Sequence, residues 1–204
     1  MKDTDFRVTN LEAPDCAQHC PCEHADPGRR LTLRAFAGAA LVAGAGVTPL
    51  PAAARPAVGD LLVADDVEKD PVAVKASEVQ AGKPMLVYPF DPGSKQIRND
   101  SKLNKIVLVR VEESDLDADS KARAAGGVLA FSVVCTHQNC EAKTWVAADK
   151  ALVCFCHASK FSVLEAGRVL AGPAPRGLPM LPLKLQGDQL AVAAPFTTPP
   201  GGAT

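Results

Sequence analysis

Two short runs of cysteine and histidine hold the side chains of this chain that are best suited to chemistry. The first run, residues 135–140, reads Cys-Thr-His-Gln-Asn-Cys, and the second, residues 154–159, reads Cys-Phe-Cys-His-Ala-Ser. Each run offers a thiolate and an imidazole two or three residues apart, and each adds a further cysteine. Two Cys and two His split into pairs suit a [2Fe–2S] cluster in which thiolates hold one iron and imidazoles hold the other. Neutral imidazoles would make such a cluster easier to reduce than an all-thiolate one.

A structural zinc ion is the alternative occupant of the same ligands. Two Cys and two His form a common tetrahedral zinc set, and buried cysteines that bind nothing are also frequent. Zinc would leave the two additional cysteines and Ser159 without a role. The pattern therefore favours the iron–sulfur interpretation over zinc or inert cysteines.

The two runs resemble the signature of the Rieske iron–sulfur family, in which C-T-H-x-x-C is followed by C-x-C-H-x-S. The resemblance covers roughly residues 59–194 and is strongest in the two loops. It implies a Rieske-type [2Fe–2S] cluster with two ligands from each run, namely Cys135, His137, Cys154 and His157. It also implies a disulfide between the loops, formed by Cys140 and Cys156, which Rieske oxygenases usually lack.

The same resemblance assigns tuning roles to three positions near the second run. Ser159 stands where the family places a hydroxyl that donates to a cluster sulfur, and such donors raise the reduction potential. Phe161 stands where quinol-oxidising members commonly carry Tyr, so that donor is absent here. Pro173 lies in a Gly-Pro-Ala-Pro stretch that resembles the proline loop covering the cluster.

Short apolar runs between turn residues predict an all-β domain of stacked antiparallel sheets, with two cluster-binding loops at one tip. The run at 128–134 is almost continuously apolar and is expected to deliver Cys135 at its end. Both ligand loops are expected to leave neighbouring hairpin ends. The polar stretch 114–125 is predicted to be a solvated excursion with at most one helical turn. The expected strands are 61–63, 85–88, 105–111, 128–134, 144–146, 151–153, 161–164, 168–170, 181–185 and 190–193.

The N-terminal region predicts export. Residues 28–33 read Gly-Arg-Arg-Leu-Thr-Leu, which resembles a twin-arginine motif, and no charged residue interrupts the Ala- and Gly-rich stretch 35–54. This stretch approaches the roughly 20 residues that a bilayer requires, so residues 31–54 could remain as a membrane anchor or be cleaved after Ala54.

The domain organisation follows from these segments. We expect a polar leader at 1–27, the signal or anchor at 28–55, a linker at 56–60, the Rieske domain at 61–195 and a flexible tail at 196–204. The leader contains Cys16, Cys20 and Cys22, but it lacks an apolar run that could build a core, so disorder is favoured over a metal site.

Composition limits the classes of partner. The formal net charge is −1, and no basic stripe appears, so nucleic-acid binding is not expected. A structural disulfide favours an oxidising compartment. Together with the export motif, this predicts a location in the bacterial periplasm or on the outer face of the cytoplasmic membrane.

The resemblance implies an exported carrier of single electrons, which relays them between a larger oxidoreductase subunit and a cytochrome or cupredoxin. No substrate-binding domain or second metal site is apparent, so catalysis by this chain alone is not expected. One alternative is a quinol-oxidising Rieske subunit of a bc-type complex. Gln138 and Asn139 weigh against quinol docking, because cytochrome bc1 subunits often carry Leu-Gly there. The other is the small Rieske subunit of a molybdenum enzyme like arsenite oxidase, suggested by a short likeness over 82–91.

Overall fold

The computed structural model of the chain describes residues 55–66 and 70–202. The predicted leader and nearly all of the predicted export signal lie outside these residues and stay predictions. The helical elements are α1 (Ala118–Lys121) and the 3-10 turns η1 (Ala76–Glu78), η2 (Lys102–Asn104), η3 (Glu113–Asp115) and η4 (Ala147–Asp149). The strands are β1 (Leu61–Ala64), β2 (Met85–Asp91), β3 (Gln96–Ile97), β4 (Ile106–Arg110), β5 (Val128–Ser132), β6 (Thr144–Val146), β7 (Ala151–Cys154), β8 (Ser159–Ser162), β9 (Val169–Ala171), β10 (Leu183–Gln186) and β11 (Gln189–Val192).

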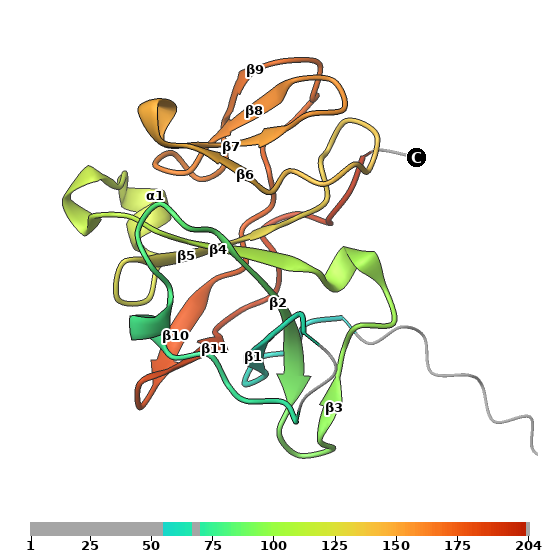
Figure 1. Cartoon of the computed structure of the whole chain (residues 1–204), viewed down its shortest axis with the longest axis vertical. Coiled ribbons are helices and arrows are strands. Elements are labelled where there is room, and N and C mark those ends of the chain that lie inside the picture. The colour runs from blue at the N-terminus through green and yellow to red at the C-terminus, as the bar shows by residue number, and fades with distance from the viewer. Residues whose placement is uncertain (1–54, 67–69, 203–204) are drawn as a thin grey trace, which may run out of the picture. The chain divides into compact units, whose positions relative to one another are not determined.

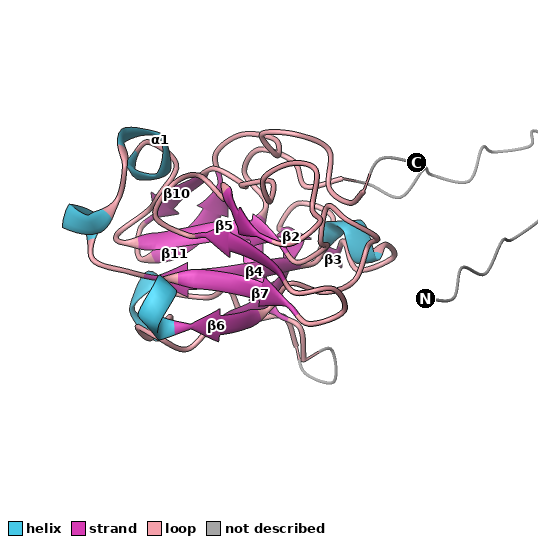
Figure 2. Cartoon of the chain, turned by 90° about the horizontal axis from the view of Figure 1, so that it is seen from above, coloured by secondary structure: helices cyan, strands magenta, loops and turns pink. Residues whose placement is uncertain are grey.

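The strands form two antiparallel sheets, as the sequence predicted. The larger sheet has the order β10-β11-β1-β2-β4-β5, with β3 paired to β2, and the smaller sheet has the order β6-β7-β8-β9. Figure 1 shows the smaller sheet at the top and the larger one curving beneath it, and Figure 2 shows that the few helical turns lie at the periphery of the strands. No helix among the described residues is long and apolar enough to cross a membrane.

Strands β4 and β5 are buried on both faces and join the two cores of the domain. Val107 pairs with Phe131, and both face the core that lies against the smaller sheet. Their neighbours Ile106 and Ala130 face the second core, inside the larger sheet. Burial on both faces explains why these strands read as nearly continuous apolar runs rather than as alternating ones.

Strand β5 ends at Ser132, two residues before the predicted end. The Ser132 hydroxyl accepts a hydrogen bond from the backbone N–H of Val134 (3.1 Å), and the N–H of Val133 donates to the carbonyl of Lys105 (3.1 Å). These bonds replace the β ladder and direct the chain toward Cys135. Because β5 and β6 belong to different sheets, the first cysteine–histidine loop leaves the end of the antiparallel β4–β5 pair and joins the two sheets.

The excursion 114–125 contains the predicted helical turn, α1, but it is not purely solvated. Asp117 caps α1 by accepting from the N–H of Ser120 (2.7 Å). Ser120 is fully buried, and its hydroxyl donates to the carbonyl of Leu164 (3.0 Å) and accepts from the N–H of Ala166 (2.8 Å). The excursion therefore supports the turn between β8 and β9.

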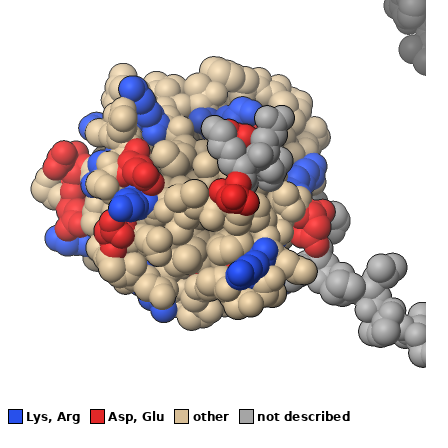
Figure 3. Space-filling view, turned by 60° about the horizontal axis from the view of Figure 1, so that its bottom comes forward, with Lys and Arg blue, Asp and Glu red and all other residues tan. Residues whose placement is uncertain are grey.

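A buried ion pair fixes the entry into β1. The Asp60 carboxylate is 3% exposed and accepts from Arg98 Nε (2.6 Å) and Nη2 (3.0 Å) as well as from the N–H of Ala57 (2.8 Å). On the face shown in Figure 3, acidic and basic side chains are interspersed rather than separated by sign.

Candidate metal centre

The first loop is a tight turn closed by its own backbone. The N–H of Cys135 donates to the carbonyl of Cys140 (2.7 Å), and the N–H of Asn139 donates to the carbonyl of Cys135 (3.1 Å). Asn139 adopts a left-handed conformation, with φ of 61°. Asn tolerates this region better than other side-chain-bearing residues do, which explains how a residue with a side chain can stand at this turn.

The second loop closes the β7–β8 hairpin. Cys154 and Ser159 are paired across the ends of the two strands, and both are buried. Between them the chain turns outward, with Ala158 at φ of 56° and the Phe155 side chain 75% exposed. The hairpin thus places a buried thiol at its base and carries His157 on its exposed turn.

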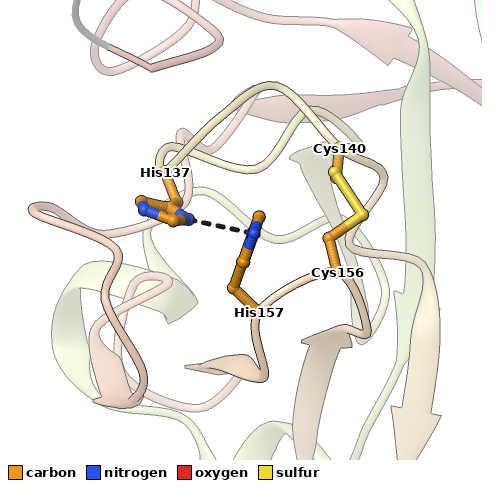
Figure 4. Close-up of a disulfide and its surroundings, with 4 residues drawn as sticks. All are labelled: His137, Cys140, Cys156 and His157. Atoms are coloured by element: carbon orange, nitrogen blue, oxygen red, sulfur yellow. Dashed lines mark hydrogen bonds between the residues drawn. A yellow bond between two sulfur atoms is a disulfide. The ribbon is translucent and has the colours of Figure 1, made fainter.

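The two loops bring the predicted histidine ligands together, with a ring nitrogen of each pointing toward the other (Figure 4). Nδ1 of His137 lies 3.2 Å from Nδ1 of His157, and the rings are nearly perpendicular. An imidazole–metal bond is about 2.1 Å long, so both nitrogens could bond one metal atom at an angle of roughly 100°. The two rings therefore present matching nitrogens at a spacing that suits a shared metal ion.

The two predicted cysteine ligands form the inner side of the same site. Cys135 and Cys154 are the free cysteines among the described residues and are 1% and 2% exposed. Burial raises the pKa of the Cys135 thiol, and the adjacent Cys154 thiol adds to the rise, whereas the backbone N–H of His137 opposes it. Such buried thiols bind metal as thiolates. The donor set is thus a sulfur pair inside and an imidazole pair toward solvent, as a cluster with two unlike irons requires.

The predicted disulfide between Cys140 and Cys156 is confirmed. It joins the two loops across a sequence separation of 16 residues (Figure 4). Sγ of Cys154 lies within 4.8 Å of both disulfide sulfurs. Sulfur atoms that are bonded to each other are not available as thiolates, so these three cysteines do not make a second metal site.

Two of the three predicted tuning residues are buried beside the cysteine pair. Ser159 is 1% exposed, and its hydroxyl has no hydrogen-bond partner within the described part of the chain. An orphaned buried hydroxyl costs free energy unless a partner is supplied, and a cluster sulfur would supply one. Phe161 is fully buried in the core that also contains Cys135 and Cys154.

The stretch that contains Pro173 packs against the second loop. A Cβ built on Gly172 would lie 2.5 Å from the Cα of Ser159 and 2.7 Å from the carbonyl oxygen of Ala158. With φ of 89°, Gly172 also needs the backbone freedom that only glycine has. Pro173 itself is exposed next to this contact. The chain at Gly172 therefore packs directly on the turn between β7 and β8.

A charged group follows the disulfide and links the first loop to the larger sheet. Glu141 lies 2.5 Å from Nζ of Lys143 and 3.8 Å from Nζ of Lys105, and Lys105 also pairs with Asp65 (3.2 Å). The hydrogen bond from Lys143 and the charge of Lys105 hold the pKa of Glu141 below its usual value, although partial burial opposes them.

Sequence reasoning missed two residues at this site. The Thr136 hydroxyl is buried and donates to the carbonyl of Arg176 (2.7 Å), which lies 40 residues further along the chain. No local pattern marks Arg176, because its partners are backbone groups distant in sequence. Thr136 belongs to the quoted motif, and that was the available signal.

Known proteins resemble the chain over the same region. Residues 68–182 match the family described as Rieske [2Fe–2S] domain. The cytochrome bc1 complex Rieske iron–sulfur subunit of Corynebacterium diphtheriae is 33% identical over 106 residues, which are 49% of this chain and 26% of that protein. A protein of Haloferax mediterranei named as a respiratory nitrate reductase Rieske subunit is 30% identical over 140 residues, 67% of this chain and 60% of that protein. The chain thus matches less than two thirds of the length of either relative.

A solved structure also resembles the chain. The plasma membrane Rieske protein of Synechocystis PCC 6803 is 23% identical, with a TM-score of 0.40 over 59% of this chain and 95% of that one.

Proposed function

Since this chain belongs to the Rieske [2Fe–2S] domain family, we propose that it carries single electrons between redox proteins. The observation that carries the proposal is the convergence of two buried thiols and two facing imidazoles at one tip. A bound [2Fe–2S] cluster would supply the one-electron chemistry there. The proposed ligands are Cys135, His137, Cys154 and His157.

The protein's own residues divide the remaining tasks. Cys135 and Cys154 would hold one iron from inside the core, and the more exposed His137 and His157 would hold the other on the side that faces solvent. The Cys140–Cys156 disulfide braces the two loops against each other. The buried Ser159 hydroxyl would donate to a cluster sulfur, and Gly172 packs on the backbone of the hairpin turn. The half-buried and exposed imidazoles give partner proteins a short path for electrons.

The partners are proposed to be larger redox assemblies. Relatives are named as subunits of a cytochrome bc1 complex and of a respiratory nitrate reductase. We therefore propose an oxidoreductase subunit as one partner and a cytochrome or cupredoxin as the other. Phe155 is exposed beside His157 and offers an apolar contact at the tip.

Export to an oxidising compartment is part of the proposal. A disulfide between the loops persists outside the reducing cytoplasm. The twin-arginine-like motif at 28–33 would provide a route for a protein that folds around its cluster before export. After export, residues 31–54 would either be cleaved off as a signal or remain as a membrane anchor.

Quinol oxidation within a bc-type complex is the second candidate, favoured by the name of the Corynebacterium relative. Gln138 counts against it, because this exposed polar side chain stands at the tip, where an apolar residue would contact quinol.

Stopped-flow mixing tests the two candidates. We expect the oxidised full chain to accept one electron from a reduced chemical donor and to pass it to a c-type cytochrome, while a short-chain ubiquinol reduces it slowly. Failure to exchange electrons with any protein acceptor would contradict the relay. Fast reduction by the quinol, made faster by Gln138→Leu, would favour the bc-type function.

A further inference from the structure

We propose that residues 197–202 form a C-terminal strap that holds the first loop in position, with Arg176 and Asn139 as its positioning residues. These residues belong to the predicted flexible tail, yet they make defined hydrogen bonds with the domain. The C-terminal strap lies beyond residues 68–182, which match the family. The role proposed for it rests on a bound cluster, as the proposed function does, but on no particular redox partner.

Arg176 binds the middle of the C-terminal strap with its planar guanidinium. Nη1 donates to the hydroxyl of Thr198 (2.9 Å), and Nη2 donates to the carbonyls of Pro199 (2.7 Å) and Gly201 (2.5 Å). The fixed fork of an arginine suits several acceptors at once better than a lysine ammonium does. Since the carbonyl of Arg176 accepts from Thr136, the same residue contacts the C-terminal strap and the first loop.

Asn139 binds the far end of the C-terminal strap. Its Oδ1 accepts from the N–H of Gly202 (2.7 Å). A Cβ built on Gly202 would lie 2.6 Å from the carbonyl oxygen of His137, and one on Gly201 would lie 2.6 Å from Asn139 Oδ1. Because Gly201 and Gly202 lack side chains, the backbone of the C-terminal strap can pack directly against His137, a proposed ligand, and Asn139.

The near end of the C-terminal strap is fixed to the core. Thr197 donates its N–H to the carbonyl of Met180 (2.9 Å), and its hydroxyl accepts from the N–H of Met180 (3.1 Å). A cavity of about 290 Å³, lined in part by Leu103, Pro199 and Pro200, lies beside the segment. The rest of the C-terminal strap is held by its hydrogen bonds to Arg176 and Asn139.

The consequence concerns access to the cluster. The C-terminal strap restrains both sides of His137, through Thr136 and Arg176 on one side and through Asn139 on the other. Without it, the first loop would open more often, and solvent or a chelator would reach the iron on the imidazole side. The C-terminal strap should thus slow the loss of the cluster.

The test uses the full chain with its cluster and measures two rates. One is the loss of visible absorbance in the presence of an iron chelator, and the other is amide hydrogen exchange over residues 136–140. A chain that ends at Thr197, and Asn139→Gly in the full chain, should each accelerate both rates, by about fivefold for each hydrogen bond removed. Gly preserves the left-handed backbone at 139, and Asn139→Asp preserves the acceptor, so the Asp variant should keep both rates near those of the parent.

A pair of arginine variants separates this role from a general structural one. Arg176→Gln should accelerate cluster loss in the full chain but add nothing in the chain that ends at Thr197, because its strap partners are then gone. Arg168→Gln, which removes an exposed ion pair with the nearby Glu165, should change neither rate. Parent-like rates in the shortened chain, or equal effects of Arg176→Gln in both chains, would overturn the proposal. If the shortened chain does not fold, the contrast between Asn139→Gly and Asn139→Asp decides the question in the same way.

Discussion

Gly172 packs directly on the backbone of Ser159, so closely that a Cβ on Gly172 would lie 2.5 Å from the Cα of Ser159. Gly172 therefore lies against the second loop at Ser159. The Ser159 hydroxyl is buried and has no hydrogen-bond partner in the described part of the chain. A buried hydroxyl that faces the cysteine pair is placed to donate to whatever those cysteines bind.

Removal of this hydroxyl should lower the midpoint potential of the cluster. A donor to a cluster sulfur stabilises the more negative, reduced state. Loss of a hydrogen bond of about 1 kcal/mol corresponds to roughly 40 mV for one electron, so Ser159→Ala should shift the potential down by about that amount. Protein-film voltammetry measures the shift, and Ser162→Ala, another buried serine of the same strand, is the control. Equal potentials for Ser159→Ala and the parent would show that the hydroxyl does not reach a sulfur.

Addition of a hydroxyl at Phe161 should have the opposite effect. Phe161 is fully buried in the same core as Cys135 and Cys154. In Phe161→Tyr, a phenolic donor to a ligand sulfur would raise the midpoint potential by a similar few tens of millivolts. Phe161→Leu changes the packing without adding a donor and should not raise it. A rise in both variants would assign the effect to packing instead.

Loss of the disulfide should weaken retention of the cluster without abolishing its assembly. The Cys140–Cys156 bond closes a loop of 16 residues, for which constraint of the unfolded chain contributes about 3 kcal/mol. Cys140→Ser should therefore bind iron and sulfide but release them faster and melt at a lower temperature. A double variant, Cys140→Ser with Cys156→Ser, should behave alike and excludes an effect of the unpaired thiol. Parent-like release by both variants would refute the bracing role.

Acid should destabilise the domain partly through Glu141. Its pKa is lowered in the folded protein, first by the hydrogen bond from Lys143 and also by the charge of Lys105. The folded state then binds fewer protons than the unfolded state, so this stabilisation is present above the unfolded value of about 4.3 and is lost as pH falls through the lower folded value. Glu141→Gln should lower the free energy of unfolding at neutral pH and flatten its dependence on pH below about 4.3.

Urea unfolding at several pH values measures this dependence. Glu165→Gln is the control, because Glu165 is similarly exposed and, within the described part of the chain, its carboxylate pairs with the nearby Arg168. If the free energy of unfolding fell equally steeply with pH in Glu141→Gln and in the parent, Glu141 would not be a source of the acid sensitivity.

Local pattern predicted both loops and every strand except the two-residue β3 (Gln96–Ile97), because their residues alternate or turn within a few positions. The disulfide followed from a resemblance in the same short runs. The end of β5 at Ser132 could not be predicted, since a side-chain hydrogen bond and the carbonyl of Lys105 decide it. The hydrogen bond from Thr136 to Arg176 could not be predicted from the sequence either, because its acceptor is a backbone carbonyl 40 residues away.

The joining of two different sheets by the first loop has a similar origin. Residues 128–134 read as one apolar strand, and nothing in them indicates that the chain leaves the larger sheet for the smaller one. The partner strands of β5 and β6 decide this, and strand pairing over long separations leaves no local signature.

The proposed ligand set has one iron held by the imidazoles of His137 and His157 and the other held by the thiolates of Cys135 and Cys154. Pulsed EPR of the reduced full chain, with ¹⁵N introduced into histidine alone, tests this assignment. We expect a Rieske-type signal with hyperfine couplings from two histidine nitrogens; in His157→Ala one coupling should remain, or the signal should be lost together with the cluster. A paramagnetic cluster without histidine couplings, or a colourless protein that contains zinc and gives no signal, would contradict it.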